Sequence, residues 1–200
     1  RLARQALLRS DRGAVPFEHL HGYSTLSVVA RRPWVRRLSR GVIVRRARGA
    51  DEDRLRTFMN EKSRETQLGP VFDTSFFSRR LEQWPEFSLE NFYLAFDESE
   101  EIVGCLAPWD SSSINRIVLE RLSASANVIR QMCNLLAPLT RRPRIETGPS
   151  SALPDIALTH VYIRNRSAHV LAALLDVAQH DIFVSRQYAT ISLCLYDEDP

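Results

Sequence analysis

The chain has 200 residues, which is enough for one hydrophobic core, or for one domain with part of another. An apolar fraction of 44% and a charged fraction of 26% are typical of a globular protein, and no apolar run approaches the roughly 20 residues needed to span a bilayer. Because the amino terminus also lacks the hydrophobic stretch of a signal peptide, the sequence predicts a cytoplasmic protein with no membrane segment.

Basic residues are concentrated near the amino terminus. Residues 1–48 hold twelve arginines against Asp11 and Glu18, whereas the rest of the chain is net acidic. The densest group comprises Arg31, Arg32, Arg36, Arg37 and Arg40. Such a group can contact nucleic acid, an acidic partner or the acidic remainder of the chain, and the absence of a nucleic-acid-binding signature favours the last. Only Lys62 is a lysine, a bias typical of a GC-rich bacterial genome.

Cysteine and histidine spacing argues against a metal site. Cys105, Cys133 and Cys194 lie far apart among apolar neighbours, which predicts buried thiols rather than disulfides or metal ligands. The five histidines form no ligand pattern either.

Hydrophobic patterning predicts alternating strands and helices. In chain order we expect a helix end at 2–9, strands at 25–30 and 41–47, helices beginning near 51 and 73, strands at 92–96 and 102–109, a helix at 124–139, a strand at 158–163, a helix from 169 and a strand at 188–196. An acidic turn joins the strands at 92–96 and 102–109 into a hairpin, with Gly104 marking a bulge. The helix at 124–139 is expected to direct Val128, Met132, Leu135 and Leu136 inward.

The stretch 158–176 joins a strand, an arginine-containing turn and a helix. From His169 the apolar residues change to helical spacing, so the helix begins directly beyond the strand end. Backbone N–H groups at such a helix start can bind phosphate or pyrophosphate, although many units of this kind bind nothing. The strand at 188–196 is predicted to be central in the sheet.

This order of elements resembles the GNAT superfamily of acyl-CoA-dependent N-acyltransferases. The stretches that carry the resemblance are VRRARGADEDRL, NFYLAFDESEEIVGCLAPWD, LTHVYI with RNRSAHVLAALLDVA, and YATISLCLYD. The chain is similar to a bacterial subgroup of long proteins with two GNAT modules. The resemblance implies an α/β domain over residues 39–200, with a mixed central sheet flanked by helices.

Residues 1–38 resemble the helix, Gly-Tyr loop and closing strand that end a GNAT module. Two interpretations are open. These residues are the tail of a preceding module with a basic linker, which leaves the domain at 39–200 truncated at its carboxyl end. Otherwise they fill the place of this domain's own closing elements, within the chain or across a dimer. A partner GNAT module or a homodimer is the expected protein partner.

The resemblance implies acetyl-CoA as cosubstrate and a small-molecule or peptide amine as acceptor. The residues implied to hold the cosubstrate are Val161, Tyr162, Ile163, Arg164, Arg166, Ser167, Ala168 and His169. The family motif R/Q-x-x-G-x-G/A uses glycines so that the backbone can approach the pyrophosphate. Here Ser167 and His169 hold those positions if the motif begins at Arg164, and His169 and Leu171 hold them if it begins at Arg166. Retention and loss of acyl-CoA binding are both open.

Two residues are candidates for catalysis. His160 occupies the strand position where the family often carries a base that deprotonates the amine, and histidine titrates near neutral pH. The alternative interpretation is that His160 is simply a polar residue on one face of the strand, without a catalytic role. Tyr196 is the nearest candidate to protonate the departing thiolate, and Trp109 and Asp110 are candidates for the border of an acceptor pocket. Three functions remain open: an N-acetyltransferase, a degenerate non-catalytic module that supports a partner module or binds a ligand, and a nucleic-acid-associated module.

Overall fold

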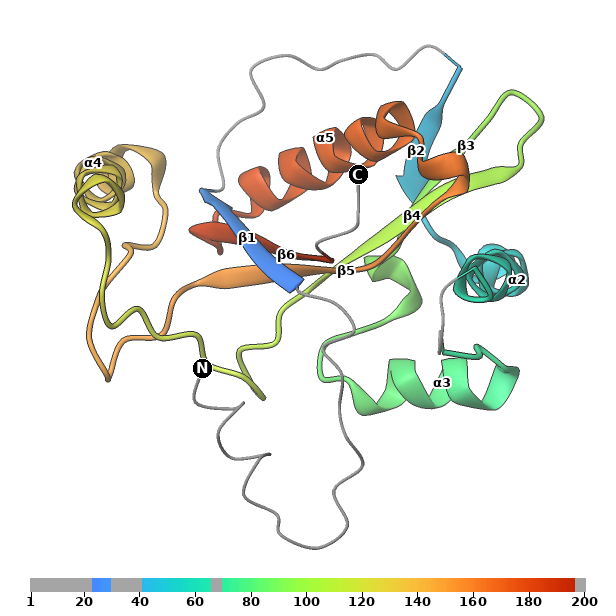
Figure 1. Ribbon diagram of the computed structural model, residues 1–200, viewed down its shortest axis with the longest axis horizontal. Helices are drawn as coiled ribbons and strands as arrows, with labels where there is room; N and C mark the ends of the chain where they lie inside the picture. Colours follow the sequence, from blue (N-terminus) through green and yellow to red (C-terminus); the bar gives the residue numbers. More distant parts are fainter. Residues whose placement is uncertain (1–22, 30–40, 66–69, 197–200) are drawn as a thin grey trace, which may run out of the picture.

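A mixed six-stranded sheet forms the centre of the chain (Figure 1). The computed structural model describes residues 23–29, 41–65 and 70–196. The strands are β1 (Tyr23–Val29), β2 (Ile43–Arg46), β3 (Tyr93–Phe96), β4 (Ile102–Trp109), β5 (Asp155–Ile163) and β6 (Thr190–Tyr196), in the spatial order β1-β6-β5-β4-β3-β2. The pair β5–β6 is parallel and the other neighbours are antiparallel. The predicted α/β fold with a mixed, helix-flanked sheet is confirmed.

Helices cover both faces of this sheet (Figure 1). The longer helices are α2 (Glu52–Ser63), α3 (Thr74–Gln83), α4 (Ala124–Thr140) and α5 (Ala168–Ser185), and the short 3-10 turns are η1 (Gly49–Asp51), η2 (Leu89–Asn91) and η3 (Arg164–Arg166). Phe58 of α2 and Phe77 of α3 belong to a hydrophobic core on one face, together with Phe92. Val170 and Leu174 of α5 pack into a second core on the other face. The predicted helices near residue 51 and from residue 169 thus each pack an apolar side against the sheet.

The hairpin β3–β4 is confirmed, and Gly104 has a specific packing role in it. The strand register shifts beside Gly104, where Ala95 pairs with Gly104 but Phe96 pairs with Ile102. A Cβ at residue 104 would lie 2.7 Å from Val170 Cγ1 of α5. Glycine thus allows α5 to pack directly against the middle of β4.

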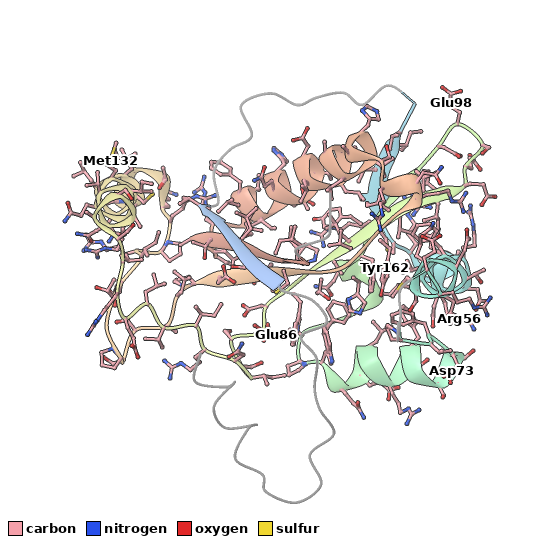
Figure 2. The ribbon with its side chains drawn as sticks, in the orientation of Figure 1. Arg56, Asp73, Glu86, Glu98, Met132 and Tyr162 are labelled. Atoms are coloured by element: carbon pink, nitrogen blue, oxygen red, sulfur yellow. The ribbon has the colours of Figure 1, made fainter. Side chains whose placement is uncertain are left out.

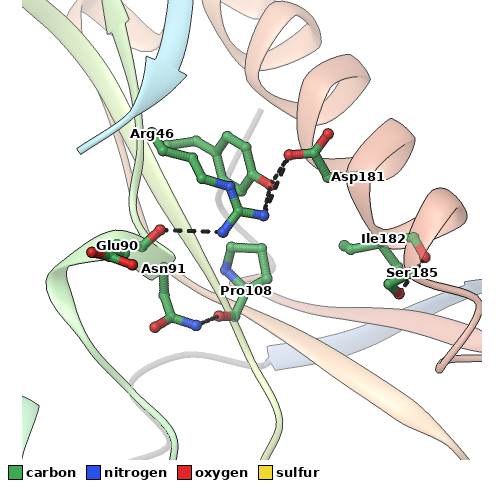
Figure 3. Close-up of polar contacts among 8 residues, drawn as sticks. Arg46, Glu90, Asn91, Pro108, Asp181, Ile182 and Ser185 are labelled. Atoms are coloured by element: carbon green, nitrogen blue, oxygen red, sulfur yellow. Dashed lines mark hydrogen bonds and ion pairs between the residues drawn. The ribbon is translucent and has the colours of Figure 1, made fainter. Parts of the chain in front are cut away.

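Polar contacts hold the carboxyl half of α5 to β2 and β3 (Figure 3). The buried Tyr93 hydroxyl donates to Asp181 Oδ2 at 2.6 Å, and Arg46 Nη2 donates to the Tyr93 hydroxyl at 2.7 Å. Burial and the Asp181 carboxylate raise the pKa of Tyr93, so the hydroxyl stays a donor. This network joins β2, β3 and α5 and fixes the direction of the helix.

Strand β1 occupies the position beside β6. All seven of its residues pair antiparallel with β6, from Tyr23 opposite Tyr196 to Val29 opposite Thr190. The strand β6 is therefore central, as predicted, because β5 pairs on its other side. The division of the chain at residue 38 and the two interpretations of residues 1–38 stay predictions.

The predicted inward face of α4 is wrong. Val128, Met132, Leu135 and Leu136 are exposed, and Ala137 is the buried residue of this helix. The helix contacts the rest of the chain through its opposite side, where Asn134 Oδ1 accepts from the Ile145 N–H at 2.7 Å. The amphipathic pattern predicts a helix correctly here, but the apolar face points away from the body.

The prediction of buried cysteines holds only for Cys105. Its thiol lies on β4 and donates to the His160 carbonyl at 3.4 Å. Cys133 is half-buried and Cys194 is exposed. Apolar neighbours in sequence are therefore not sufficient to bury a cysteine of this chain.

The close contact of α5 with β4 predicts the effect of Gly104→Ala. The added methyl group would overlap Val170, so we expect the free energy of unfolding to fall by about 1–3 kcal/mol. Denaturant unfolding measures this, and Gly49→Ala is the control, since a Cβ at residue 49 meets nothing within 4 Å. An equal effect of the two substitutions would contradict the packing role.

Candidate functional site

The parallel strands β5 and β6 pair along only part of their length. Their paired residues run from Asp155 opposite Thr190 to Leu158 opposite Leu193. Both strands continue, β5 to Ile163 and β6 to Tyr196. Within the described residues, the ladder between β5 and β6 therefore ends at Leu158 and Leu193, before either strand ends.

A bulge in β5 begins just beyond Leu158, the last residue of β5 that pairs with β6. The register to β4 changes from Ala107 opposite Thr159 to Cys105 opposite Tyr162, so β5 contains one extra residue. His160 has a φ of 51°, in the left-handed region where histidine is found more often than most residues. Ile156 and Leu158 face α5, and beyond the bulge so do Val161 and Ile163. The extra residue thus turns His160 and Tyr162 toward the opposite face.

The imidazole of His160 lies in a ring of aromatic side chains on the α2–α3 face. Phe87 stacks on it with a centroid distance of 5.5 Å and an interplanar angle of 21°. The other rings around it are Phe92 at 5.4 Å, Trp84 at 5.5 Å and Phe72 at 6.2 Å. The Nδ1 atom is 2.6 Å from the Thr159 hydroxyl, which fixes the ring orientation. Figure 2 labels Tyr162, which lies on the same face against Phe72.

The turn from β5 to α5 carries the predicted phosphate-binding residues. Arg164–Arg166 forms a 3-10 turn with left-handed φ at Asn165 and Arg166, and α5 begins at Ala168. Ser167 is the N-cap with a φ of −68°, which every residue tolerates. Its hydroxyl accepts from the Val170 N–H at 3.4 Å. The serine therefore fits without strain, but it occupies one N–H that a glycine would leave for an anion.

The two arginines of this turn differ in direction. Arg164 reaches α2, where its Nη2 lies 3.6 Å from Glu61 Oε2 and its guanidinium lies over the Phe58 ring. Arg166 is exposed, as are Ala168 and His169 at the helix start. Of the two arginines, only Arg166 remains exposed to bind an anion at this turn.

Trp109 and Asp110 lie at the end of β4, on the side of the aromatic ring. Trp109 stacks on Trp84 with centroids 4.1 Å apart, and its indole N–H donates to the Pro85 carbonyl at 3.0 Å. Asp110 Oδ2 accepts from the Tyr188 hydroxyl at 3.1 Å. Burial, together with Asp110, raises the pKa of Tyr188 to about 12, so this phenol is neutral at physiological pH.

Several predicted residues lie wholly or partly outside the described part of the chain. Tyr196 is the last residue of β6, but its side chain lies outside the described part of the chain. The arginines at 31–40 lie outside it as well. Within the described ranges, no helix is long and apolar enough to cross a membrane. The same ranges contain no group of three or more residues able to hold a metal ion.

Sequence reasoning missed the bulge and the aromatic ring around His160. The aromatic residues of that ring lie just before and after α3, far from β5 in the sequence, so no local spacing brings them to His160. The ion pair of Arg164 with Glu61 of α2 was missed for the same reason. A histidine in the middle of an apolar strand was the only local signal.

Comparison with solved structures identifies the fold. A GCN5-related N-acetyltransferase from Sphaerobacter thermophilus superposes with a TM-score of 0.55 and 14% identity, over 88% of this chain and 42% of that chain. A GCN5-related glucosamine N-acetyltransferase region of a fungal multi-domain GH3 beta-N-acetylglucosaminidase superposes with a TM-score of 0.51 and 10% identity, over 96% of this chain and 20% of that chain. No protein-family model and no curated protein matches the sequence.

The chain therefore has the fold of the GCN5-related N-acetyltransferases, and the resemblance to the GNAT superfamily is confirmed at the level of fold. At these identities the likeness concerns the fold alone. The chain spans less than half of the length of either matched structure.

The left-handed backbone at His160 predicts an order of stability among its variants. Asparagine tolerates a positive φ, whereas a β-branched residue does not, so we expect His160→Val to be less stable than His160→Asn by about 1–2 kcal/mol. Thermal and denaturant unfolding measure both. Valine is the more apolar residue and would be favoured by the aromatic surroundings alone, so a more stable valine variant would contradict the bulge geometry.

Proposed function

We propose that this chain binds an acyl-CoA and acts as an N-acetyltransferase on an amine. The observation that carries the proposal is that the β5–β6 ladder ends at Leu158, so that the last residues of β5 before the turn to α5 are not paired with β6. The proposal is that this edge of β5 receives an extended amide-containing chain and that the nearby amino terminus of α5 receives a phosphate. The GCN5-related fold supports the same class of reaction.

The residues present fit acetyl-CoA in part. The edge of β5 from His160 to Ile163 would hold the extended pantetheine arm through backbone groups. The exposed Arg166, Ala168 and His169 would lie beside the pyrophosphate. Ser167 reduces the number of N–H groups left for a phosphate, because its hydroxyl already accepts from the Val170 N–H. The pyrophosphate is thus the weaker part of the fit.

Bound acetyl-CoA would supply the acetyl group as a thioester, so that a C–N bond to the amine forms as the C–S bond breaks and the amine proton ends on the coenzyme A sulfur. The acceptor is proposed to enter on the α2–α3 face, where His160 lies among Trp84, Phe87 and Phe92. His160 is proposed to take the amine proton, held in place by the Thr159 hydroxyl. Tyr196 is proposed as the proton donor to sulfur.

Calorimetric titration with acetyl-CoA and coenzyme A tests the binding step. We expect the parent chain to bind, and Ser167→Gly to bind about tenfold more tightly, because one N–H then becomes available to a charged phosphate. Loss of the serine cap itself costs only a few tenths of a kcal/mol when glycine replaces it.

Ser123→Gly is the matched control, because Ser123 caps α4 in the same way, accepting from the Ala126 N–H at 3.2 Å. It should leave the affinity unchanged. If neither the parent nor Ser167→Gly binds, the proposal fails and a non-catalytic module remains. In a panel of amines, His160→Asn should lower the release of coenzyme A thiol while leaving the affinity for acetyl-CoA unchanged.

A further inference from the structure

Helix α4 is held to the body through its polar side. The Asn134 amide pairs with both backbone groups of Ile145, accepting from the N–H at 2.7 Å and donating to the carbonyl at 2.9 Å. Arg130 Nη1 donates to the same carbonyl at 3.3 Å. Cys133 packs against Leu153 and Ile145 in a small separate core. These contacts fix which side of the helix faces the body.

The opposite side of α4 is an apolar surface, here called the α4 face. Its six members are between 49% and 82% exposed: Val128, Ile129, Met132, Leu135, Leu136 and Leu139. Arg130 is the single charged residue within the helix, and it points to the body. Scattered apolar residues are normal on a surface, but a contiguous group of this size marks an interaction site. Figure 2 shows the labelled Met132 on α4 at the edge of the molecule.

We propose that the α4 face binds the α4 face of a second copy of this chain, as an antiparallel helix pair about a two-fold axis. Val128, Met132, Leu135 and Leu139 follow one another at spacings of four, three and four residues, which is the seam pattern of a coiled coil. A two-fold axis between residues 133 and 134 places Met132 opposite Leu135 of the partner subunit. It also places Val128 opposite Leu139 of the partner subunit, so every seam residue meets an apolar residue.

Charge favours the antiparallel orientation. The exposed Arg141 and Arg144 follow the carboxyl end of α4. A parallel pair would bring these arginines of both copies together, whereas an antiparallel pair places them at opposite ends and also opposes the two helix dipoles. The face itself carries no charge that would select a chemically different partner.

The area of the α4 face is sufficient for a specific contact. Six side chains that each expose about 100 Å² would bury about 1,200 Å² over the two copies, which lies at the lower bound for specific protein–protein interfaces. The proposal is independent of the proposed catalytic function, since α4 contributes no residue to the site described above.

Sedimentation of the full chain over a wide range of concentration tests the proposal. We expect a reversible monomer–dimer equilibrium. Leu135→Glu should shift it to the monomer, because the carboxylate would be buried against Met132 of the partner subunit. Val184→Glu is the matched control, an exposed apolar residue at the end of α5, and should leave the dimer intact. Circular dichroism and thermal unfolding confirm that each variant is folded.

Mixing two variants tests the orientation. Met132→Lys and Leu135→Glu should each be monomeric, and their mixture should form a heterodimer, since lysine and glutamate meet only in the antiparallel arrangement. A chain that is monomeric at every concentration would overturn the proposal, as would a dimer that survives Leu135→Glu. Loss of the dimer without rescue in the mixture would overturn the antiparallel geometry. A monomer that sediments with anionic lipid vesicles would assign the face to a lipid surface instead.

Discussion

The contact of α5 with β4 at Gly104 is the constraint on which the rest of the fold depends. Because residue 104 has no Cβ, Val170 and Leu174 of the helix reach the middle of the sheet. The hydrogen bond from Tyr93 to Asp181 then fixes the other half of the helix. With both halves held, the amino terminus of α5 lies immediately beyond the end of β5.

The candidate site follows from two departures from regular sheet geometry near the same point of β5. The ladder to β6 ends at Leu158, and the bulge at His160 shifts the register to β4. The first departure ends the pairing of β5 with β6 before the turn to α5, and the second directs His160 into the aromatic ring on the α2–α3 face. Ligand binding at the edge and acid-base chemistry at the imidazole would therefore meet at one short segment, which is the spatial relation an acyltransferase needs.

Much of the fold could be predicted from the sequence, because the elements differ in hydrophobic period. The change of period after residue 168 predicts the β5–turn–α5 unit, and the hairpin follows from two strands around an acidic turn. The bulge in β5 could not be predicted, since one inserted residue leaves no signal in the hydrophobic pattern of so short a strand. The hydrophobic pattern also could not predict which side of α4 faces the body of the protein. A pattern shows which face is apolar, but the contacts of Asn134 and Arg130 with Ile145 decide which face meets the body.

Amide hydrogen exchange with and without coenzyme A tests the central claim most directly, which is that the end of β5 and the start of α5 form an acyl-CoA site. The account predicts slower exchange on binding at residues 159–169 and at the carboxyl half of β6. Exchange in α4 should stay unchanged and serves as an internal reference. Saturating coenzyme A that leaves residues 159–169 unprotected, or that protects only other segments, would contradict the account.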